Sequence, residues 1–510
     1  MDRREFLGGA SLAGAAMSLP ANILASDLPA DVTDLSASNL SAAIRQGHVS
    51  CVEVMQAYLA RIHRYNPTYN AVVSMVADDD LIAQAKLADN ALSDDEYWGW
   101  MHGMPHAVKD LADAMGLHTC WGSPVFANNV AEQDDLHVSR MRAEGAIFIG
   151  KTNTPEFGFG SQSYNPVHGT TKSAYDPKLT AGGSSGGAAC GLATHMLPVA
   201  DGSDMMGSLR NPAAFNNVVG FRPSQGRVPA LPSNDLFYQQ LSTDGPMGRN
   251  AQDTIRLLET MAGYDSRSPL SLRDVIPSYD RFRKVNLAGY RIGWMGDYQK
   301  YLPMEAGVLE VCTASLEGLS KQGAIVEDCM PDYDMARLWQ TWLTFRHWAT
   351  GNGSMGTLYK DPETRGLLKP EIQWEVEGSF DMPASRVAEA GVARADWYRA
   401  LLRLFETYDI LALPTAQVFP FDANTHWPKA IGRKKMDTYH RWMEAVIGGT
   451  LSGLPVISLP AGFDARGRPM GIQFIGRMGE DKRVLEFAMA HELATGYSGI
   501  RPTLTETGPN

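Results

Sequence analysis

Cysteine is scarce in this chain of 510 residues: only five are present, Cys51, Cys120, Cys190, Cys312 and Cys329. A small, odd number of cysteines does not form a disulfide framework, and a chain of this length can bury a substantial core without one. No set of cysteines and histidines has the spacing of a zinc site, and the sequence HExxH is absent. We therefore expect no metal ion and no other cofactor.

A net positive charge and long apolar runs are also lacking. The formal net charge is −12, which argues against nucleic acid as a partner, because nucleic-acid binding favours a basic face. No internal apolar run reaches the roughly 18–20 residues that a membrane helix needs, so we expect no stable membrane insertion. The balance of 44% hydrophobic and 20% charged residues is ordinary for a soluble enzyme.

The first residues have a composition of their own. Arg3 and Arg4 precede Phe6, Leu7 and a weakly apolar run rich in glycine and alanine, which resembles a twin-arginine export signal. Asp2 stands where serine or threonine is more usual; the alternative is a disordered N-terminus. The resemblance predicts a cleaved signal peptide over residues 1–26 and a catalytic domain over 27–510. The twin-arginine machinery would then export the folded protein to a bacterial periplasm.

The rest of the chain alternates helical and apolar strand patterns. Ser50 and Glu53 have the spacing of a capping box at the start of a helix. Residues 105–108 predict a strand that ends at Lys109, and residues 243–246 predict a turn before a helix. The alternation predicts an α/β fold: a single large domain with a mixed, mostly parallel sheet covered by helices on both faces.

One motif points to nucleotide binding but is better explained as a strand. Residues 145–152 match the phosphate-loop pattern GxxxxGKT letter by letter. That loop needs small residues that expose backbone amides, whereas residues 146–149 are Ala-Ile-Phe-Ile, which favour a buried strand. We therefore expect Lys151 to have a structural position.

The stretch from Ala181 to Pro223 contains two groups of serines beside glycines. Ser184 and Ser185 lie within GGSSGG, and Ser208 follows Gly207. Glycine lets backbone amides approach a substrate carbonyl closely. A serine becomes a nucleophile only with a base and an oxyanion site, and Lys109 could supply the base from another segment.

An alternative interpretation is the nucleophile elbow GxSxG, which both Ser184 and Ser185 fit. An α/β-hydrolase would then need an acid and a histidine later in the chain, and His440 and His491 are available. This interpretation leaves Lys109 and Ser208 without roles.

Taken together, Val-Lys-Asp at Lys109, the GGSSGG loop and Gly-Ser-Asp-Met-Met-Gly-Ser-Leu-Arg-Asn-Pro around Ser208 resemble the amidase signature family. This family includes fatty acid amide hydrolase and the amidotransferase A subunits. The resemblance implies that Ser208 is the nucleophile, that Ser184 is a bridging serine beside a cis peptide bond, and that Lys109 is the base. It also implies an oxyanion hole formed by the backbone N–H groups of Met205, Met206, Gly207 and Ser208.

The chemistry implied by the resemblance requires an unusual lysine. An ordinary lysine, with a pKa near 10.4, is protonated at neutral pH and cannot act as a base. Burial without a full counter-charge lowers that pKa, so we expect Lys109 to be neutral in the resting enzyme. The family counterpart of Ser185 orients the lysine and the loop, and we expect Asp204 and Arg210 to fix the loop through a salt bridge or backbone hydrogen bonds.

Met206 departs from the family pattern, which usually has glycine at this position. If the backbone there needs a positive φ, methionine is strained; otherwise its side chain narrows the acyl pocket. Trp339, Trp342 and Phe345 recur three residues apart, which is typical of a helix packed on the core or of the wall of an apolar substrate channel. The family resemblance supports the channel, within a variable region around residues 330–440.

The sequence therefore predicts an exported serine hydrolase that cleaves the C–N bond of a small-molecule amide through an acyl-enzyme. An ester or carbamate hydrolase with the same triad is an alternative. Two further alternatives are a glutaminase subunit of an amidotransferase and a non-catalytic protein whose oxyanion site is blocked by Met206. The natural substrate and the oligomeric state stay open.

Overall fold

The computed structural model describes residues 28–238 and 240–506. The expected signal peptide, residues 1–26, lies outside the described residues. Among the described residues, no helix is both long and apolar enough to cross a membrane.

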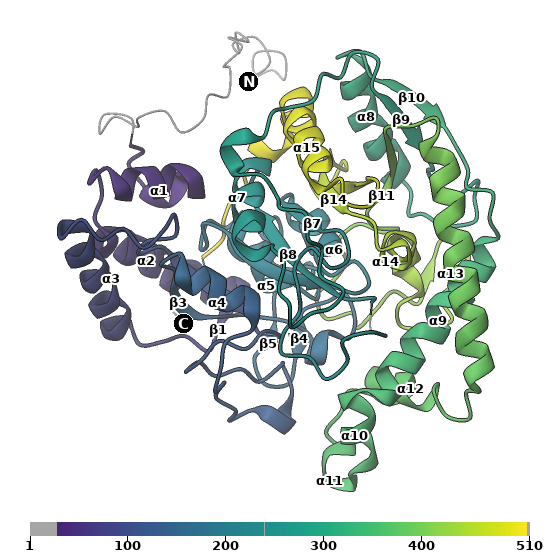
Figure 1. The fold of residues 1–510 in the computed structure, drawn as a ribbon, viewed down its shortest axis with the longest axis horizontal. Coiled ribbons are helices and arrows are strands. Elements are labelled where there is room, and N and C mark those ends of the chain that lie inside the picture. The colour runs from purple at the N-terminus through teal and green to yellow at the C-terminus, as the bar shows by residue number, and fades with distance from the viewer. Residues whose placement is uncertain (1–27, 239, 507–510) are drawn as a thin grey trace.

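An eight-stranded mixed sheet forms the centre of the molecule (Figure 1). Its strands lie in the order β10 (Ile325–Asp328), β9 (Arg291–Trp294), β11 (Ile410–Pro414), β15 (Pro469–Ile475), β14 (Val456–Phe463), β7 (Val219–Arg222), β8 (Thr243–Gly248) and β6 (Ala200–Asp204). This sheet, with helices on both faces, confirms the expected single α/β domain.

The strand directions correct one part of that expectation. The sheet is mixed, but only β9 with β10 and β9 with β11 pair in parallel. The other pairs along the described sheet are antiparallel. The reason is local for β14 and β15: residues 464–468 make a connection far too short for the crossover that parallel strands require.

The two faces of the sheet are covered by different helices. Along β15, Phe474 packs against Phe487 of α15 (Asp481–Thr495), with ring centroids 4.7 Å apart. The adjacent residue Gln473 points the other way and accepts a hydrogen bond from Arg210 of α6 (Arg210–Asn216) at 2.8 Å. This alternation is that of a strand buried on both faces. The helices α7 (Ala251–Met261) and α8 (Val308–Ser320) pack beside α15.

Strand β8 is a second correction, because its residues were expected to form a turn. Pro246 pairs only with β6, at Asp201, so its missing N–H removes no hydrogen bond to β7. A side chain at Gly245 would lie 2.4 Å from the carbonyl oxygen of Phe221. The glycine and the proline are therefore compatible with a strand that tertiary contacts place inside the sheet.

A smaller three-stranded sheet carries the lysine of interest. Its order is β1 (Val72–Val73), β3 (Ile147–Thr152) and β2 (Pro105–Lys109). Lys151 lies within β3, is fully buried and donates to Thr119 Oγ1 at 3.1 Å. The segment that matches a phosphate loop is therefore a buried strand.

The N-terminal helices pack around this small sheet. Ser50 and Glu53 form the expected capping box at the start of α2, with Glu53 N–H donating to Ser50 Oγ at 3.1 Å. The helices of this part are α1 (Ala37–Arg45), α2 (Cys51–Tyr69), α3 (Asp78–Ser93), α4 (Leu136–Ala143) and α5 (Gly186–Ala193). Two short hairpins complete the strands: β4 (Tyr164–Asn165) with β5 (Gly169–Thr170), and β12 (Ala430–Ile431) with β13 (Lys434–Lys435).

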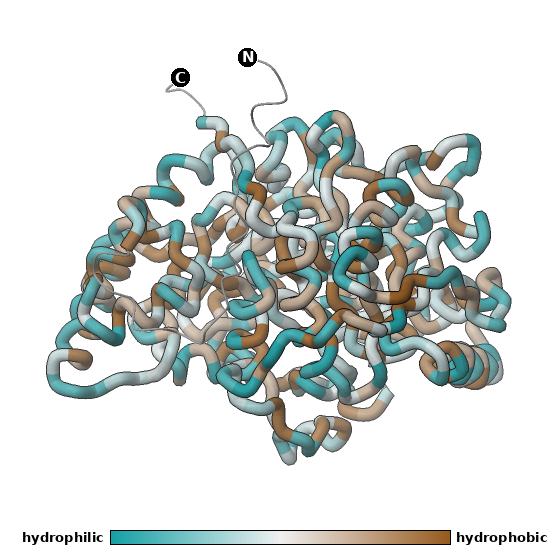
Figure 2. The backbone as a smooth tube through the Cα atoms, turned by 90° about the horizontal axis from the view of Figure 1, so that it is seen from above, coloured by the Kyte–Doolittle hydropathy of each residue, from teal (hydrophilic) through white to brown (hydrophobic). Residues whose placement is uncertain are grey.

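A helical layer lies on the side of the molecule opposite α1–α3 (Figure 1). It contains α9 (Met335–Asn352), α10 (Ser354–Lys360), α11 (Pro362–Arg365), α12 (Pro370–Glu377) and α13 (Ala384–Phe405), with α14 (Ile447–Ser452) between α13 and the sheet. Hydrophilic residues gather along the outer loops in Figure 2, with hydrophobic residues inside. A single large core cluster runs from the N-terminal helices to α15.

Candidate active site

Three chain segments meet at the candidate site. Lys109 is the last residue of β2, Ser184 and Ser185 precede α5, and Ser208 lies in the loop between β6 and α6. The backbone N–H of Lys109 lies 3.2 Å from each carboxylate oxygen of Asp201 on β6, which ties the small sheet to the edge of the large one. The end of β2 thereby points at the loop before α5, which carries Ser184 and Ser185, and at the loop after β6, which carries Ser208.

The amine of Lys109 is surrounded by hydroxyl groups. Its Nζ lies 2.8 Å from Ser184 Oγ and 2.8 Å from Ser185 Oγ. It also lies 3.0 Å from Ser203 Oγ and 3.3 Å from the carbonyl oxygen of Ser203. Lys109 and Ser184 are 1% and 2% exposed. None of these partners is a carboxylate, so the amine has no ion-pair partner in direct contact within the described part of the chain.

The loop that carries Ser184 is held by other serines. The peptide bond between Gly183 and Ser184 is cis, as the resemblance predicted. Ser161 Oγ donates to the carbonyl oxygen of Gly183 at 2.6 Å, and Ser163 Oγ donates to that of Ser184 at 3.2 Å. These contacts hold the backbone on both sides of the cis bond.

Ser208 lies against the same loop through its backbone. The N–H of Ser185 donates to the carbonyl oxygen of Ser208 at 3.1 Å, and Ser208 is 8% exposed. Within residues 28–238 and 240–506, no hydrogen bond joins Ser208 Oγ to Ser184 Oγ. The two loops are therefore adjacent.

The backbone amides before Ser208 divide into two groups. The N–H of Gly207 donates to Asp204 Oδ1 at 2.9 Å. The N–H groups of Met205, Met206 and Ser208 have no acceptor among the described residues. Gly207 has a φ of 79°, whereas Met206 is not among the described non-glycine residues of positive φ. Methionine is therefore unstrained at this position, and its side chain is buried.

A buried ion pair supports this loop from beneath. Arg210 holds Asp204 in a bidentate geometry, with Nε 2.9 Å from Oδ2 and Nη2 3.0 Å from Oδ1. Arg222 contacts the carbonyl oxygen and Oδ1 of the same aspartate. Burial opposes ionisation, but these two guanidinium groups hold the pKa of Asp204 well below its ordinary value. The arrangement positions the loop and leaves the Asp204 carboxylate without direct contact to the lysine amine.

We predict that Arg210→Met lowers the free energy of unfolding by about 3–5 kcal/mol, because it leaves a buried carboxylate incompletely paired. Urea denaturation followed by circular dichroism measures this change. The matched control is Arg267→Met, which breaks an exposed ion pair with Asp265 and is expected to change stability much less, because water screens exposed charges. Equal effects of the two substitutions would contradict the supporting role of Arg210.

Burial lowers the pKa of Lys109 to about 7, although the carboxylates of Asp201, Asp244 and Asp204 act in the opposite direction. His137 lies 3.7 Å from Asp201 Oδ2 and 3.8 Å from Asp244 Oδ2. Burial works against its protonation, but Asp244 and Asp201 raise the pKa of His137 to about 9. At neutral pH the charged imidazole therefore offsets these carboxylates, and the lysine is free to lose its proton.

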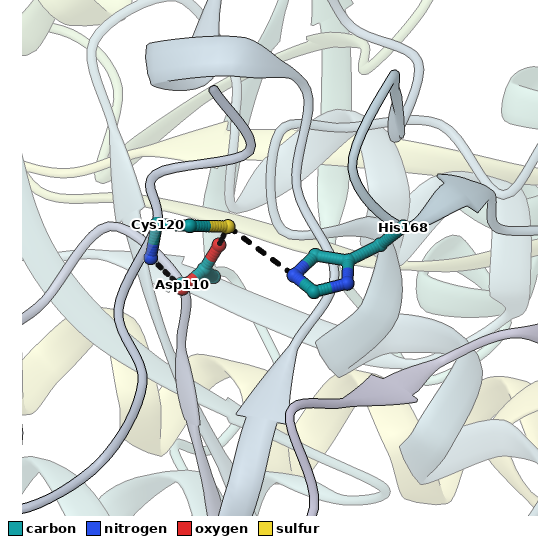
Figure 3. A group of neighbouring side chains, drawn as sticks. All are labelled: Asp110, Cys120 and His168. Atoms are coloured by element: carbon teal, nitrogen blue, oxygen red, sulfur yellow. Dashed lines mark hydrogen bonds between the residues drawn. The ribbon is translucent and has the colours of Figure 1, made fainter. Parts of the chain in front are cut away.

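A cluster of Asp110, Cys120 and His168 lies next to the lysine (Figure 3). The thiol of Cys120 donates to Asp110 Oδ2 at 3.1 Å and lies 3.2 Å from His168 Nε2. Zn²⁺ accepts such a donor set. However, both oxygens of Asp110 already accept backbone hydrogen bonds, from Cys120 and from Gly122. Burial raises the pKa of the Cys120 thiol to about 12, so the thiol stays protonated. The cluster fixes the loop after β2.

The histidines of the nucleophile-elbow interpretation lie elsewhere. His491 of α15 lies 3.0 Å from Ser315 Oγ and packs against Phe474. His440 stacks on Tyr439 with ring centroids 4.4 Å apart. Neither histidine hydrogen-bonds Ser184 or Ser185, so the geometry gives these serines a lysine and no histidine.

The tentative channel residues all lie on α9. Trp339 and Trp342 are 2% and 0% exposed and belong to the core cluster, whereas Phe345 is partly buried. Trp339 packs against His440 and Trp342 packs against the same ring, with centroids 5.2 and 6.2 Å away. The two tryptophans therefore serve as packing for this helix.

Sequence reasoning missed four residues that the structure brings to this region: Ser203, Asp201, His137 and Arg346. The first two lie on β6, within a few residues of the loop already singled out, and a search for buried partners of Lys109 would have found them. Arg346 follows Trp342 by four residues, so it lies on the same face of α9. The signal in the sequence that could have revealed Arg346 was an arginine on a helix face otherwise made of aromatic residues.

Known proteins resemble this chain over nearly its whole length. The family described as Amidase matches residues 53–485. The chain is 31% identical to the A subunit of the glutamyl-tRNA(Gln) amidotransferase of Symbiobacterium thermophilum, over 93% of this chain and 99% of that one. It is 30% identical to the acylamidase of Rhodococcus erythropolis, over 92% and 97%. Its fold is similar to that of a bacterial aryl acylamidase of the amidase signature family, with a TM-score of 0.84 and 26% identity over 91% and 98%.

Proposed function

This chain belongs to the amidase family of amidohydrolases, and from that premise we propose that it cleaves carboxylic amide C–N bonds through an acyl-enzyme on Ser208. One observation carries the proposal. The Nζ of Lys109 lies 2.8 Å from Ser184 Oγ, in surroundings that lower its pKa to about 7. A buried amine with a pKa near neutrality is uncharged in a substantial fraction of molecules, and one that touches a hydroxyl is then able to act as a base.

In the proposed mechanism, two protons move as Ser208 Oγ attacks the amide carbonyl. Ser208 passes its proton to Ser184 Oγ, and Ser184 passes its own to Lys109 Nζ. The developing oxyanion accepts hydrogen bonds from the free backbone N–H groups of Met205, Met206 and Ser208. The proton then returns through Ser184 to the leaving nitrogen as the C–N bond breaks. A water molecule attacks the acyl-Ser208 ester by the reverse route and releases the acid.

Ester and carbamate hydrolysis use the same acyl-enzyme and form the alternative within this proposal. The proposal is tested by a hydrolysis screen over aryl, fatty, cyclic and peptide amides together with the matching esters and carbamates. Release of the amine from at least one amide class, with saturation kinetics, is the expected result. Hydrolysis of esters or carbamates without any amide would replace the proposal by the alternative.

We predict that kcat/KM for an uncharged amide rises about tenfold per pH unit at low pH and levels off above a pKa of about 7. The sign follows from the direction of the shift: burial lowers the pKa of Lys109, so the neutral, basic form is the one present above about pH 7. A pH–rate profile between pH 5 and 9 measures this dependence. A flat profile, or one that falls as the pH rises, would contradict the role of the lysine.

A second candidate is supported by the relatives named as the A subunit of glutamyl-tRNA(Gln) amidotransferase. In that case the chain would hydrolyse glutamine and transfer its ammonia as part of a complex. Glutaminase activity that appears only with partner proteins would favour this candidate. Turnover of aryl or fatty amides by the isolated chain would favour the free hydrolase.

A third candidate is a non-catalytic binding protein whose oxyanion site is blocked by Met206. The unstrained backbone at Met206 and the free amides beside it do not favour that interpretation. A fluorophosphonate that labels the wild-type protein but not Ser208→Ala would exclude it.

We further propose that residues 1–26 form a twin-arginine signal and that the domain over 27–510 acts in a bacterial periplasm. Arg3, Arg4 and the weakly apolar run after them support this proposal. Lysine at both arginine positions is expected to retain the full-length chain in the cytoplasm, which fractionation and immunoblotting would show. Unchanged export of that variant would exclude the twin-arginine route.

A further inference from the structure

Arg346 is a buried cation that none of the proposed steps uses. It lies on α9 and is only 8% exposed. A buried arginine needs a partner for its charge and acceptors for its N–H groups, so its contacts show what the surrounding structure provides and what it leaves open.

Three neighbours hold the guanidinium in place. Its Nε lies 3.2 Å from Glu375 Oε1 on α12, and its Nη2 lies 3.4 Å from the hydroxyl oxygen of Tyr439. That hydroxyl donates to Glu375 Oε1 at 2.8 Å. The plane of the group lies over the ring of Phe159, with the central carbon 4.2 Å from the ring centroid. The charge is therefore paired and the orientation is fixed.

The remaining nitrogen has a poor partner. The only acceptor that Arg346 Nη1 contacts among the described residues is the thioether sulfur of Met205. A thioether is a weak acceptor, so this charged donor has no oxygen partner among the described residues. Met205 is itself only partly buried.

Two separate contacts place this nitrogen beside the proposed reaction centre. Met205 opens the loop that ends at Ser208, and its backbone N–H is one of the free donors. On the other side, Phe159 follows Gly158, and a side chain built on Gly158 would lie 3.5 Å from Ser184 Oγ. Met205 thus lies three residues before Ser208 along one segment, and Phe159 lies next to the residue that approaches Ser184 along the other.

We propose that Arg346 Nη1 binds a second oxygen of the substrate, distinct from the oxygen of the scissile carbonyl, and thereby selects amides that carry a further neutral carbonyl group. This inference rests on the proposed function of the same site. The substrate oxygen replaces the sulfur of Met205 as the acceptor, and the flexible methionine side chain moves aside. The gain is a charge-assisted hydrogen bond in a position where the protein offers only a thioether.

The charges around Arg346 favour a neutral acceptor over a carboxylate. Glu375 is fully buried and already balances the guanidinium. His347 lies 2.9 Å from Glu375 Oε2, and His440 lies 3.7 Å from Oε1. Burial lowers the pKa of His440 to about 3, so it adds no positive charge at neutral pH. A substrate carboxylate would bury a second negative charge beside Glu375, whereas a ketone or amide oxygen would not.

The test compares p-nitroanilides of three kinds with equal acyl length: one plain alkanoyl chain, three chains that each carry a ketone at a different position, and one chain that ends in a carboxylate. For the wild-type protein we expect the best ketone to exceed the plain chain by about tenfold to a hundredfold in kcat/KM, mainly through KM. We expect the carboxylate to react no faster than the plain chain.

The decisive variant is Arg346→Lys, which keeps the charge beside Glu375 but removes the planar group that presents Nη1. It is expected to lower the ketone-to-plain ratio to about one. The matched control is Arg337→Lys, on the same helix and ion-paired to Asp396, which is expected to keep the wild-type ratio. The double variant Arg346→Met with Glu375→Gln removes both charges, avoids an unpaired buried carboxylate and is expected to lose the preference as well.

The outcomes separate this inference from the proposed function. Turnover of every chain at similar rates, or a ketone preference that survives Arg346→Lys, would overturn the inference alone. A preference for the carboxylate that disappears in Arg346→Lys would overturn the choice of a neutral acceptor. No turnover of any anilide or of any amide in the screen would overturn the proposed function and this inference with it.

Discussion

Ser208→Ala is expected to lower kcat/KM for amide hydrolysis by about 10⁵-fold or more, because it removes the hydroxyl on which the proposed acyl-enzyme forms. The side chain is small and no hydrogen bond of its Oγ within the described residues would be lost. Thermal unfolding should therefore be little changed. The measurements are steady-state kinetics with an aryl amide and mass-spectrometric detection of a fluorophosphonate adduct, which the variant should not form.

A buried serine outside the site provides the control. Ser315→Ala removes the same atom from α8, where Ser315 contacts His491, and is expected to keep both the activity and the labelling. If Ser208→Ala retained the adduct, or if Ser184→Ala alone abolished it while Ser208→Ala did not, the nucleophile would have been assigned to the wrong serine.

Lys109→Met is expected to lower amide turnover by about 10⁴-fold and the turnover of an ester with the same acyl group by about 10²-fold. Positioned acid–base groups contribute factors in this range. The difference arises because an amine leaves only with a proton, whereas an alkoxide or phenoxide is a better leaving group. In the structure, Lys109 Nζ lies 2.8 Å from Ser184 Oγ, the hydroxyl through which the proton would return to the leaving amine.

Equal losses for the amide and the ester would contradict the return of the proton. Lys151→Met serves as the control, since Lys151 is a buried lysine of the neighbouring strand that contacts Thr119 and none of the site serines. It is expected to keep the amide-to-ester ratio, whatever its effect on stability.

Comparison of the wild type with Lys109→Met also tests the pKa of Lys109 through the free energy of unfolding. The pKa of Lys109 is lowered to about 7 by burial, whereas an unfolded lysine titrates near 10.4. Between these values the unfolded chain binds the proton and the folded chain does not. The free energy of unfolding therefore rises with pH in this window. Wild type is expected to gain stability relative to Lys109→Met between about pH 7 and pH 10; parallel curves would indicate an ordinary lysine.

Several features of the fold followed from short stretches of sequence because the forces involved are local. The capping box of Ser50 and Glu53 depends on neighbouring residues alone, and the apolar runs before Lys109 and at residues 147–152 favour buried strands locally. Strand β8 was missed for the opposite reason. Glycine and proline at 245 and 246 favour a turn locally, but the pairing of this segment with β6 and β7 decides its conformation.

By itself, the sequence determined which segments carry hydroxyl, amine and glycine, and so which chemistry was available. Only the tertiary structure decided the state of these groups. Lys109 and Ser203 are 94 residues apart in the chain, and Arg346 and Met205 are 141 apart. The lowered pKa of the lysine comes from burial between such segments, and the raised pKa of His137 on α4 comes from carboxylates on β6 and β8. Burial and charge depend on which distant residues come into contact, and a linear pattern does not contain that information.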